Sequence, residues 1–462
     1  MDSYDIVVIG GGPVGENAAD YAIRGSDRTA LLVEAGLLGG ECSYYACMPS
    51  KALLRPLDVA ETANHLPGIR PDVTVDRDAL LARRDDWVSH YDDAGQISWA
   101  EGAGIEVARG RGRLAGEKLV EITAADGGVR QVEARLAVVI ATGSTPIIPS
   151  SLEPVLPWTS RDATGVREVP KRLAIVGGGV VACESARWLA ALGAEVTMLV
   201  RSERVLADAE EFASEAVAQG LREAGVDVRL NTEVTQATRE DARDTGLGRP
   251  HGGPVTLTIG EETVQVDEVL AATGRRPATD DLGLDTLALG PEDLDDPEQR
   301  PSWLHTVGDA SGDAPLTHWG KYRARQFGKE LAARCEGREL PPTPAFVPVP
   351  QVVFSSPQLA FVGKTERRAK ALGRRVRVLD ADYGAVAGTA LLRDDAAGHV
   401  RLVVDADTDV LLGATFLGPD VAELLHSATV AITGGLTLDT LQHAVASYPT
   451  AAEVWLNLLE NQ

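Results

Sequence analysis

The pattern of apolar and polar positions predicts the same strand–turn–helix–strand unit twice. Each unit begins with a short apolar run, passes through a glycine-rich turn into a helix, and ends in a second apolar run. The segments are residues 5–9, 10–15, 16–23 and 29–33 in the first unit, and residues 172–176, 177–182, 183–192 and 195–200 in the second. Such βαβ units build nucleotide-binding α/β domains, so two of them predict two nucleotide cofactors.

Other segments predict how the rest of the chain is built. Residues 58–93 read as helical, with Leu80, Leu81 and Trp87 on an apolar face. The remaining predicted segments are strands at 104–114, 129–140, 400–404 and 411–417, a polar loop within a hairpin at 236–254, and a proline-rich linker at 340–350. We therefore expect an α/β protein with two Rossmann-like dinucleotide-binding domains and a C-terminal α+β domain.

Composition narrows the class of protein. Hydrophobic residues make up 44% of the chain and charged residues 24%, which is ordinary for a globular protein. The formal net charge of −24 argues against nucleic acid and against an anionic membrane surface as partners. No apolar run approaches the ~20 residues of a membrane-spanning helix, and the first residues lack the basic region of a signal peptide. We expect a cytoplasmic protein.

The first glycine turn has the spacing Gly10-x-Gly12-x-x-Gly15 and lies between a strand and a helix. Glycines at these places let the backbone approach a pyrophosphate, which then sits at the positive end of the helix. Glu34, at the end of the second strand, is placed to accept hydrogen bonds from a ribose hydroxyl pair. The turn, the helix and the acid together favour a dinucleotide site over a plain tight turn.

The second glycine turn reads Gly177-x-Gly179-x-x-Ala182, and alanine is allowed at the third place because that position only needs close packing. At the place that the acid occupies in the first unit, this unit has Arg201, followed by Ser202. An arginine and a serine suit a 2′-phosphate, so NADPH is favoured over NADH. The alternative is a surface arginine without a ligand.

Four cysteines are too few for a disulfide scaffold. Cys42 and Cys47 form a close pair, which in a cytosolic chain points to redox chemistry or to a metal. Two cysteines without a nearby histidine make a poor zinc site. A helix N-terminus would stabilise a thiolate in this pair. Cys183 and Cys335 stand alone in helical patterns, and we expect both to be small core residues.

Residues 39–51 read Gly-Gly-Glu-Cys-Ser-Tyr-Tyr-Ala-Cys-Met-Pro-Ser-Lys. This segment resembles the signature Gly-Gly-x-Cys-x-x-x-x-Cys-x-Pro-Ser-Lys of the pyridine nucleotide–disulfide oxidoreductases, a family of flavoenzymes. Further segments resemble the same family. Two of them, Ala141-Thr142-Gly143-Ser144 and Ala272-Thr273-Gly274-Arg275, are similar to the links between the family's FAD and NAD(P) domains. A third, Val307-Gly308-Asp309, resembles the segment whose Asp would hold the ribityl chain of the flavin. The fourth, Val353-Phe354-Ser355-Ser356-Pro357-Gln358, resembles the start of the dimerisation domain.

The resemblance implies a domain order and a partner. An FAD-binding domain would use residues 1–150 and 269–340, and an NAD(P)-binding domain residues 151–268. Residues 341–462 would form the dimerisation domain, and the active site of the homodimer would be shared across the interface.

The resemblance also implies roles for the site residues. NAD(P)H would deliver a hydride to one face of the flavin, and the Cys42–Cys47 disulfide would be opened at the other face. Cys47 would be the flavin-side, charge-transfer thiol, and Cys42 the outer thiol that attacks the substrate. Lys51 would lie near the flavin N5, with Glu184 as its ion-pair partner.

The family's His-Pro-Thr-x-x-Glu near the C-terminus reads Tyr448-Pro449-Thr450-Ala451-Ala452-Glu453 here. Histidine, with a pKa of ~6.5, exchanges protons at neutral pH, whereas tyrosine, with a pKa of ~10, is a poor base there. His443 is a possible substitute, but its spacing favours a surface role. The mercuric reductases of the family share Tyr448 and the Val-Val-Ala that follows Gly179. No cysteine follows Cys335, so we do not expect their Cys-Cys tail.

These observations leave several functions open. The leading hypothesis is an NADPH-dependent, FAD-containing reductase that works through Cys42 and Cys47. Its small-molecule acceptor would be an activated disulfide or a thiophilic metal ion. The alternatives are direct electron transfer from flavin to a quinone or oxygen, oxidation of a dithiol of the dihydrolipoamide type, and a non-enzymatic flavin sensor. The missing histidine and the non-acidic Arg201 count against the dithiol oxidase.

Overall fold

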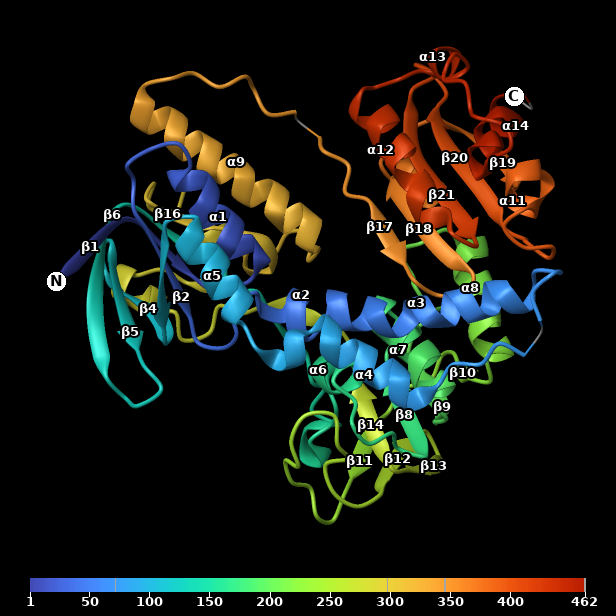
Figure 1. Ribbon diagram of the computed structural model, residues 1–462, viewed down its shortest axis with the longest axis horizontal. Coiled ribbons are helices and arrows are strands. Elements are labelled where there is room, and N and C mark those ends of the chain that lie inside the picture. The colour runs from blue at the N-terminus through green and yellow to red at the C-terminus, as the bar shows by residue number, and fades with distance from the viewer. Residues whose placement is uncertain (71, 297, 345, 461–462) are drawn as a thin grey trace. The chain divides into compact units, whose positions relative to one another are not determined.

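The computed structural model describes residues 1–70, 72–296, 298–344 and 346–460, and the chain divides into two compact units. Unit 1 comprises Met1–Pro49, Arg84–Ile147 and Gly274–Thr343, and unit 2 comprises Ser50–Arg83, Ile148–Thr273 and Pro344–Gln462. Helices and strands are mixed in both units (Figure 1), which confirms the predicted α/β class. Among the described residues, no helix is both long and apolar enough to cross a membrane.

Unit 1 is built on a seven-stranded sheet with the order β3-β2-β1-β6-β5-β4, in which β16 also pairs with β6. The strands are β1 (Asp2–Ile9), β2 (Ala30–Glu34), β3 (Ile105–Arg109), β4 (Arg111–Gly116), β5 (Leu119–Thr123), β6 (Val129–Ile140) and β16 (Leu304–Thr306). β1 lies between β2 and β6 in parallel, with Ile6 opposite Ala30 and Ala137. The run Ile6–Ile9 is buried, as expected for a central parallel strand.

Two helices of unit 1, α1 (Pro13–Ile23) and α9 (Thr317–Glu336), lie side by side on one face of this sheet (Figure 1). They approach closely because Gly328 of α9 has no side chain: a Cβ there would lie 2.6 Å from the backbone of Tyr21. Unit 1 also contains α2 (Gly40–Tyr44), α5 (Ala94–Gly102), and a two-stranded ribbon of β7 (Ser144–Pro146) and β15 (Arg275–Pro277).

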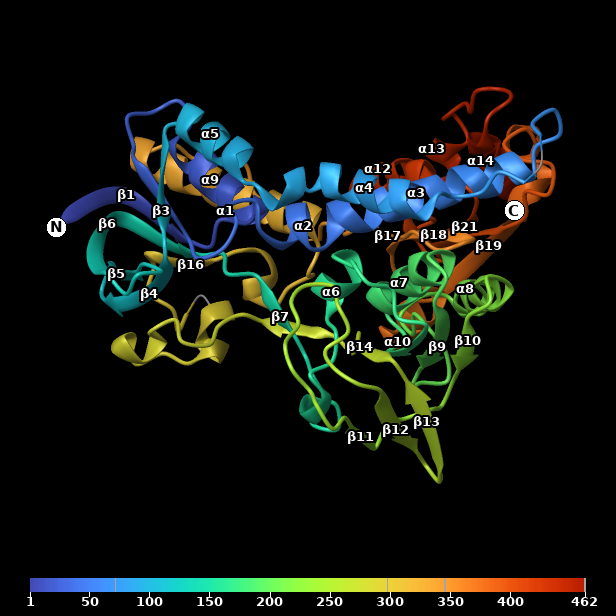
Figure 2. The same cartoon turned by 60° about the horizontal axis from the view of Figure 1, so that its bottom comes forward.

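The central part of unit 2 carries the second βαβ unit. Its parallel sheet has the order β10-β9-β8-β14. It also contains a three-stranded antiparallel sheet with the order β11-β12-β13 (Figure 2). The elements are α6 (Ser160–Thr164), β8 (Arg172–Val176), α7 (Val180–Ala191), β9 (Glu195–Leu199), α8 (Glu211–Glu223), β10 (Asp227–Arg229), β11 (Gln236–Thr238), β12 (Val255–Ile259), β13 (Glu262–Val266) and β14 (Glu268–Ala271). Trp158 and Trp188 anchor the core of this part.

The C-terminal part of unit 2 is a five-stranded antiparallel sheet with the order β17-β18-β21-β20-β19. The elements are β17 (Gln351–Val353), β18 (Gln358–Gly363), α10 (Glu366–Ala371), β19 (Val376–Asp382), α11 (Ala387–Ala390), β20 (His399–Asp405), β21 (Leu411–Gly418), α12 (Leu425–Thr433), α13 (Leu438–Leu441) and α14 (Val454–Glu460). α12 packs on β18 and β21 (Figure 1), and Phe416 and Trp455 meet in the core below it.

Several local predictions were wrong. The helix predicted at 58–93 is two helices, α3 (Cys47–Asn64) and α4 (Arg77–Trp87), because Pro67 and Gly68 interrupt the pattern; Pro71 lies outside the described residues. Trp87 is exposed rather than part of an apolar face. The strand predicted at 104–114 is two strands, β3 and β4, separated at Gly110, whose φ is 151°.

Three further predictions can be compared with the structure. The predicted loop at 236–254 does lie within a hairpin, but its first residues form β11. The described residues of the predicted linker at 340–350 form no helix or strand, and Ala345 is outside the described residues. Cys183 is buried as expected, whereas Cys335 is exposed near the end of α9, so its prediction as a core residue was wrong.

Candidate functional site

The two cysteines of the signature segment lie at a junction of two helices. Cys42 belongs to α2 and Cys47 is the first residue of α3; the thiols of both are half-buried. The Sγ of Cys47 lies 3.4 Å from the Oγ1 of Thr317, at the start of α9. The Cys47 thiol and burial both raise the pKa of Cys42 well above its usual range. The pair therefore gives up one proton much more readily than two.

Glycines place this segment against the first nucleotide turn. Gly39 and Gly40 both have positive φ, 103° and 56°, which opens α2 with a tight change of direction. A Cβ on Gly40 would lie 2.8 Å from the Cα of Gly12, so the two backbones touch. The double glycine of the signature thus packs the cysteine-bearing helix of unit 1 onto the glycine turn before α1.

Aromatic residues between the cysteines hold the segment from another side. The Tyr44 hydroxyl group lies 3.1 Å from Gln96 Oε1, and the ring of Tyr45 stacks on Tyr91 with 5.5 Å between centroids. Tyr91 ends a left-handed turn in which Ser89, His90 and Tyr91 have φ values of 48°, 52° and 61°. Left-handed backbone is costly for residues with a Cβ. Because this turn contains no glycine, it could not be predicted from the local pattern.

The first glycine turn has the geometry of a phosphate cradle. A Cβ on Gly10 would lie 2.3 Å from the carbonyl oxygen of Ala141, and one on Gly15 would lie 1.9 Å from that of Gly10. At Gly12 a Cβ would meet nothing nearer than 4.0 Å, so this face of the turn is open. No side chain caps the N-terminus of α1. An open glycine face before an uncapped helix start suits the pyrophosphate of FAD.

Acidic residues flank this cradle at the carboxyl ends of the strands. Glu34, the last residue of β2, accepts hydrogen bonds from the backbone N–H groups of Gly11 at 2.7 Å and Gly36 at 2.6 Å. Asp309 follows β16 and accepts a hydrogen bond of 2.6 Å from Ser144 Oγ. The sheet thus brings Glu34 and Asp309 to the edge where α/β proteins bind ligands.

The segment after β6 is fixed by contacts within unit 1. Thr142 Oγ1 donates a hydrogen bond of 2.7 Å to the carbonyl oxygen of Ala278, and Gly143 has φ of 76° with open space at its Cβ position. Gly274, predicted to bind the nicotinamide nucleotide, belongs to unit 1, where its carbonyl oxygen accepts a hydrogen bond from the N–H group of Ile147.

The second glycine turn in unit 2 repeats the first. A Cβ on Gly177 would lie 2.2 Å from the carbonyl oxygen of Ala272, whereas nothing lies within 4 Å at Gly179. Ala182 is fully buried in α7, as packing at the third place requires. Arg201 and Ser202 are exposed just beyond β9, and Ser202 Oγ donates a hydrogen bond of 2.8 Å to the carbonyl oxygen of Arg204.

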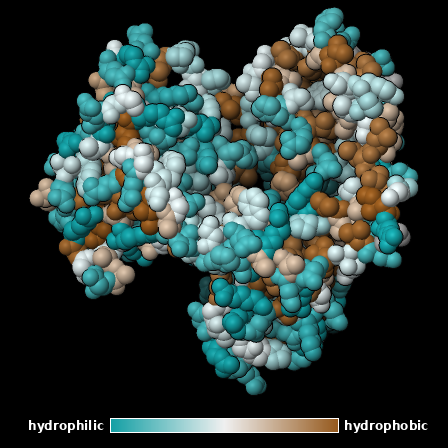
Figure 3. Space-filling model, viewed as in Figure 1, coloured by the Kyte–Doolittle hydropathy of each residue, from teal (hydrophilic) through white to brown (hydrophobic). Residues whose placement is uncertain are grey.

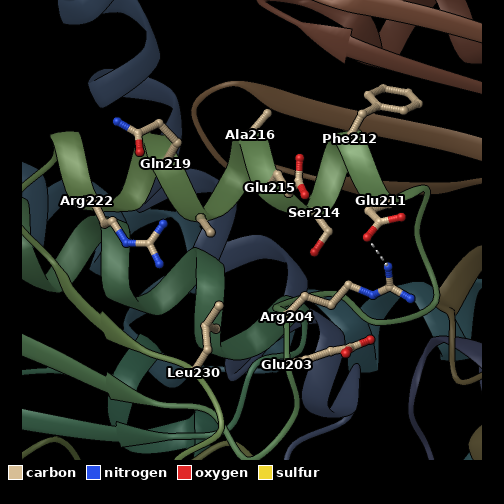
Figure 4. A pocket seen from close by; sticks show the side chains of 11 residues that line it. Glu203, Arg204, Glu211, Phe212, Ser214, Glu215, Ala216, Gln219, Arg222 and Leu230 are labelled. Atoms are coloured by element: carbon tan, nitrogen blue, oxygen red, sulfur yellow. Dashed lines mark ion pairs between the residues drawn. The ribbon is translucent and has the colours of Figure 1, made fainter.

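A cavity of about 620 Å³ lies beside α8 in unit 2 (Figure 4). Its lining includes Arg204 and Arg222, but also Glu203, Glu211 and Glu215. Arg204 forms an ion pair with Glu211 at 3.7 Å, drawn as a dashed line. Neither Arg201 nor Ser202 lines the cavity, and the acidic excess disfavours a phosphate, so we do not assign it to the nucleotide.

Lys51 and Glu184, predicted as partners, meet within unit 2. The Nζ of Lys51 lies 2.7 Å from Oε2 of Glu184, whose side chain is 5% exposed. The other oxygen of Glu184 accepts a hydrogen bond of 3.0 Å from the backbone N–H group of Phe354. The Lys51 ammonium lies 4.8 Å from the centroid of the Phe354 ring. Residues 353–358 were interpreted only as the start of a dimerisation domain, so this contact was not predicted.

The last predicted site residues, Tyr448 and Glu453, lie near the C-terminus, as does the possible substitute His443. Tyr448 is 78% exposed in the single chain. Glu453 accepts a hydrogen bond of 3.2 Å from the N–H group of Gly388 at α11. His443 is exposed as well. The chain therefore presents the Tyr448 phenol at its surface.

Two family models match most of the chain. Residues 4–293 match the family described as pyridine nucleotide-disulphide oxidoreductase, and residues 349–459 match its dimerisation domain. Dihydrolipoyl dehydrogenase of Thermus scotoductus is 32% identical, over 98% of this chain and 96% of that protein. Mercuric reductase of Streptomyces lividans is also 32% identical, over 97% of this chain and 94% of that protein.

Solved structures share the fold over the full length. The HOCl-induced flavoprotein disulfide reductase RclA of Escherichia coli, solved as a Cu(II) complex, superposes with a TM-score of 0.82 at 22% identity, and all of both chains is covered. LpdA of Mycobacterium tuberculosis gives the same TM-score at 23% identity, covering all of this chain and 99% of that one.

Proposed function

The chain belongs to the pyridine nucleotide-disulphide oxidoreductase family, and from that premise we propose that it transfers electrons from NADPH through the Cys42–Cys47 pair to a disulfide or a thiophilic metal ion. It is a flavin-dependent oxidoreductase by family. The observation that carries the proposal is the pair itself: Cys47 stands at a helix start against Thr317, and its thiol keeps Cys42 protonated.

The residues of unit 1 fit FAD. The open face of Gly12 and the start of α1 would hold its pyrophosphate, Glu34 its adenosine ribose, and Asp309 its ribityl chain. Bound FAD would accept a hydride from NADPH and pass two electrons to the cysteine pair. Lys51, held by Glu184, would present a positive charge to the flavin.

The cysteine pair would exchange with a disulfide acceptor in two steps. The sulfur of Cys42 attacks one acceptor sulfur, the acceptor disulfide breaks, and the first acceptor thiol leaves. Cys47 then attacks Cys42 in the mixed disulfide, which releases the second acceptor thiol and forms the Cys42–Cys47 disulfide. Two electrons and two protons pass to the acceptor in total.

Proton transfer limits which acceptors suit this pair. Because Cys47 raises the pKa of Cys42, the attacking thiol first has to lose its proton. Tyr448, which stands at the family's histidine position, is a weak base near neutral pH. A disulfide with an acidic leaving thiol needs little acid catalysis, and a soft metal ion displaces the thiol proton itself. We therefore favour these acceptors over ordinary alkyl disulfides.

The nucleotide preference is proposed from the second βαβ unit. Its strand β9 ends before exposed Arg201 and Ser202, a pair of donors, where the first unit has the acceptor Glu34. A guanidinium pairs well with a 2′-phosphate, whereas a carboxylate favours a free ribose. We propose NADPH as the electron donor.

A homodimer accompanies this function, since residues 349–459 match the dimerisation domain. Apolar side chains gather on the surface of the C-terminal segment at the upper right of Figure 3. Exposed apolar residues of the C-terminal segment are Val430 of α12, Val445, and Leu456 of α14, which are 53%, 91% and 50% exposed. Exposed apolar side chains of this kind suit burial against a second copy. We propose that Tyr448 and Glu453 complete the partner's cysteine site in the cytoplasmic enzyme.

The proposal is tested by removing the outer thiol. The Cys42→Ser variant should bind FAD, and NADPH should still reduce this flavin. The variant should reduce acceptors about 100-fold more slowly than wild type, or slower still. Cys335→Ser, which removes an exposed cysteine, is the matched control and should retain full activity. Full activity of Cys42→Ser with a quinone or oxygen would instead establish direct electron transfer from the flavin.

The acceptor screen follows from the relatives. The rate of the wild-type enzyme should be measured under anaerobic conditions with each of five acceptors: Hg(II), Cu(II), an aromatic disulfide, lipoamide and a quinone. These are chosen because the similar proteins include a mercuric reductase, a dihydrolipoyl dehydrogenase and a Cu(II)-complexed reductase. Higher activity with dihydrolipoamide and NAD⁺ than with every acceptor would contradict the proposed direction of electron flow.

A further inference from the structure

We propose that Phe354 is a positioning residue for Lys51, through its ring and through its backbone N–H group. This inference rests on the proposed function, because it assumes that the Lys51 ammonium acts on the bound flavin. The ring restrains the ammonium directly, and the N–H group orients the carboxylate that pairs with it.

Both oxygens of Glu184 are engaged, each by a different member of the cluster. Oε2 lies 2.7 Å from the Nζ of Lys51, and Oε1 accepts the 3.0 Å hydrogen bond of the Phe354 N–H group. The carboxylate is nearly fully buried, so it cannot exchange these partners for water. Its plane is therefore fixed by Phe354, and the direction of the ion pair follows from that plane.

The Phe354 ring acts on the ammonium itself. Its centroid lies 4.8 Å from Nζ, within the range of cation–π attraction. The side chain of Lys51 is 37% exposed, and a four-carbon stem with one ion pair retains many rotamers. A second contact with a fixed ring narrows the positions of the charge to those that touch both partners.

The backbone of Phe354 is itself held in place. Its carbonyl oxygen accepts a hydrogen bond of 3.4 Å from Nη1 of Arg187, which lies one turn after Glu184 on α7. Arg187 also forms ion pairs with Asp58 at 2.5 Å and Glu61 at 2.9 Å and is 7% exposed. Phe354 thus receives one contact on its N–H group and another on its carbonyl from a single helix.

The next residues continue the restraint. Ser356 Oγ donates a hydrogen bond of 2.7 Å to Oε1 of Glu61, and the same oxygen lies 2.9 Å from Nη1 of Arg393. The short segment from 354 to 356 is therefore tied to α3 and α7 at three points. Such a segment can orient a ring, whereas a loosely held one could only fill space.

A simple packing role would be served by any apolar side chain. Phe354 is partly buried against the core of unit 2, so this alternative makes a different prediction. Phe354→Leu keeps the N–H group and an apolar side chain but removes the ring. Phe354→Tyr restores the ring. Phe346→Leu is the matched control, because the Phe346 ring lies 4.3 Å from the ammonium of another lysine, Lys364.

The experiment measures two properties of the purified holoenzymes. Anaerobic dye-coupled titration gives the reduction potential of bound FAD, and mass spectrometry gives the rate at which acetic anhydride acetylates Lys51. Phe354→Leu should lower the potential in the same direction as Lys51→Met and raise Lys51 acetylation about two- to five-fold. Phe354→Tyr should return both to wild type, and Phe346→Leu should raise acetylation of Lys364 alone.

Three outcomes would overturn the inference. They are a wild-type potential and Lys51 acetylation rate in Phe354→Leu, a change that Phe354→Tyr fails to reverse, and a Lys51→Met variant whose potential equals that of wild type. None of these measurements involves Cys42 or an acceptor. Loss of the dithiol mechanism would be seen separately, as full activity of Cys42→Ser, so the two failures are distinguishable.

Discussion

Cys47 Sγ lies 3.4 Å from Thr317 Oγ1, although 270 residues separate them in the chain. Cys47 is the first residue of α3 and Thr317 the first residue of α9, so the contact joins two helix starts. Helix N-termini carry partial positive charge, and a hydroxyl group can donate to a thiolate. The Thr317 hydroxyl group therefore stabilises a thiolate on Cys47, and its hydrogen bond with Cys42 also lowers the pKa of that thiol.

Thr317→Val should weaken this thiolate while keeping the shape of the side chain. In the two-electron-reduced enzyme, the long-wavelength absorbance of a thiolate beside oxidised flavin should appear at a pH about one unit higher, since one hydrogen bond to a charged group is lost. An anaerobic pH titration measures this. Thr433→Val, which removes an exposed hydroxyl group on α12, is the control. An unshifted titration would show that Thr317 does not donate to the thiolate.

Gly10→Ala should abolish FAD binding. The added Cβ would lie 2.3 Å from the carbonyl oxygen of Ala141, and the backbone φ of 108° is itself unfavourable for alanine. The turn before α1 has to open, which removes the cradle. Because each ~1.4 kcal/mol of lost binding raises the dissociation constant of FAD ten-fold, a loss of several kcal/mol should leave little flavin in the purified variant, which flavin absorbance per protein measures.

Gly25→Ala separates backbone strain from the loss of space. Gly25 also has a positive φ, 68°, but nothing lies within 4 Å of its Cβ position. This variant should therefore keep its flavin and lose only about 1 kcal/mol of stability. Normal flavin content in Gly10→Ala would contradict the assignment of the turn.

Features that depend on local pattern could be predicted from the sequence. The apolar run ending at Ile9 and the glycines at 10, 12 and 15 each encode a strand or a turn through nearby residues. The Lys51–Glu184 contact was predicted from two motifs of a family, and the 2.7 Å distance between Nζ and Oε2 agrees with it.

The remaining contacts depend on tertiary packing, which no local pattern carries. Thr317 and Cys47 are 270 residues apart in the chain, so their contact depends on where α9 packs within unit 1. Phe354 reads as one apolar residue in a strand, and its contact with Glu184 uses a backbone N–H group that every non-proline residue has. The left-handed turn at Tyr91 was missed because it contains no glycine.

Arg201→Glu should convert the nucleotide preference. A carboxylate repels a 2′-phosphate and accepts hydrogen bonds from a free ribose, so kcat/KM for NADPH should fall at least about ten-fold, while that for NADH should not fall. Steady-state kinetics with one fixed acceptor measures both. Arg222→Glu, an equal charge change on the cavity of Figure 4, should alter neither value more than about two-fold. Equal losses in both variants would indicate a general effect of charge.

Glu16 gives the fold of unit 1 a dependence on pH. It lies in the first turn of α1, and its Oε1 is buried with no hydrogen-bond partner in the described structure. Burial raises the pKa of Glu16 from 4.5 to about 7; Lys321 opposes this rise and Glu34 adds to it. Protonated Glu16 thus favours the folded state fully below pH 4.5, and this contribution is lost as the pH rises through about 7.

Glu16→Gln removes the ionisation while keeping the shape of the side chain. Relative to wild type, it should therefore be more stable at about pH 8.5 by roughly 3 kcal/mol, and by only roughly 1 kcal/mol at about pH 5.5. Thermal unfolding of the holoenzymes at the two pH values measures the difference. Glu101→Gln, on the exposed surface of α5, should change stability little at either pH. An advantage of Glu16→Gln that is equal at both pH values would mean that Glu16 does not titrate between them in the folded protein.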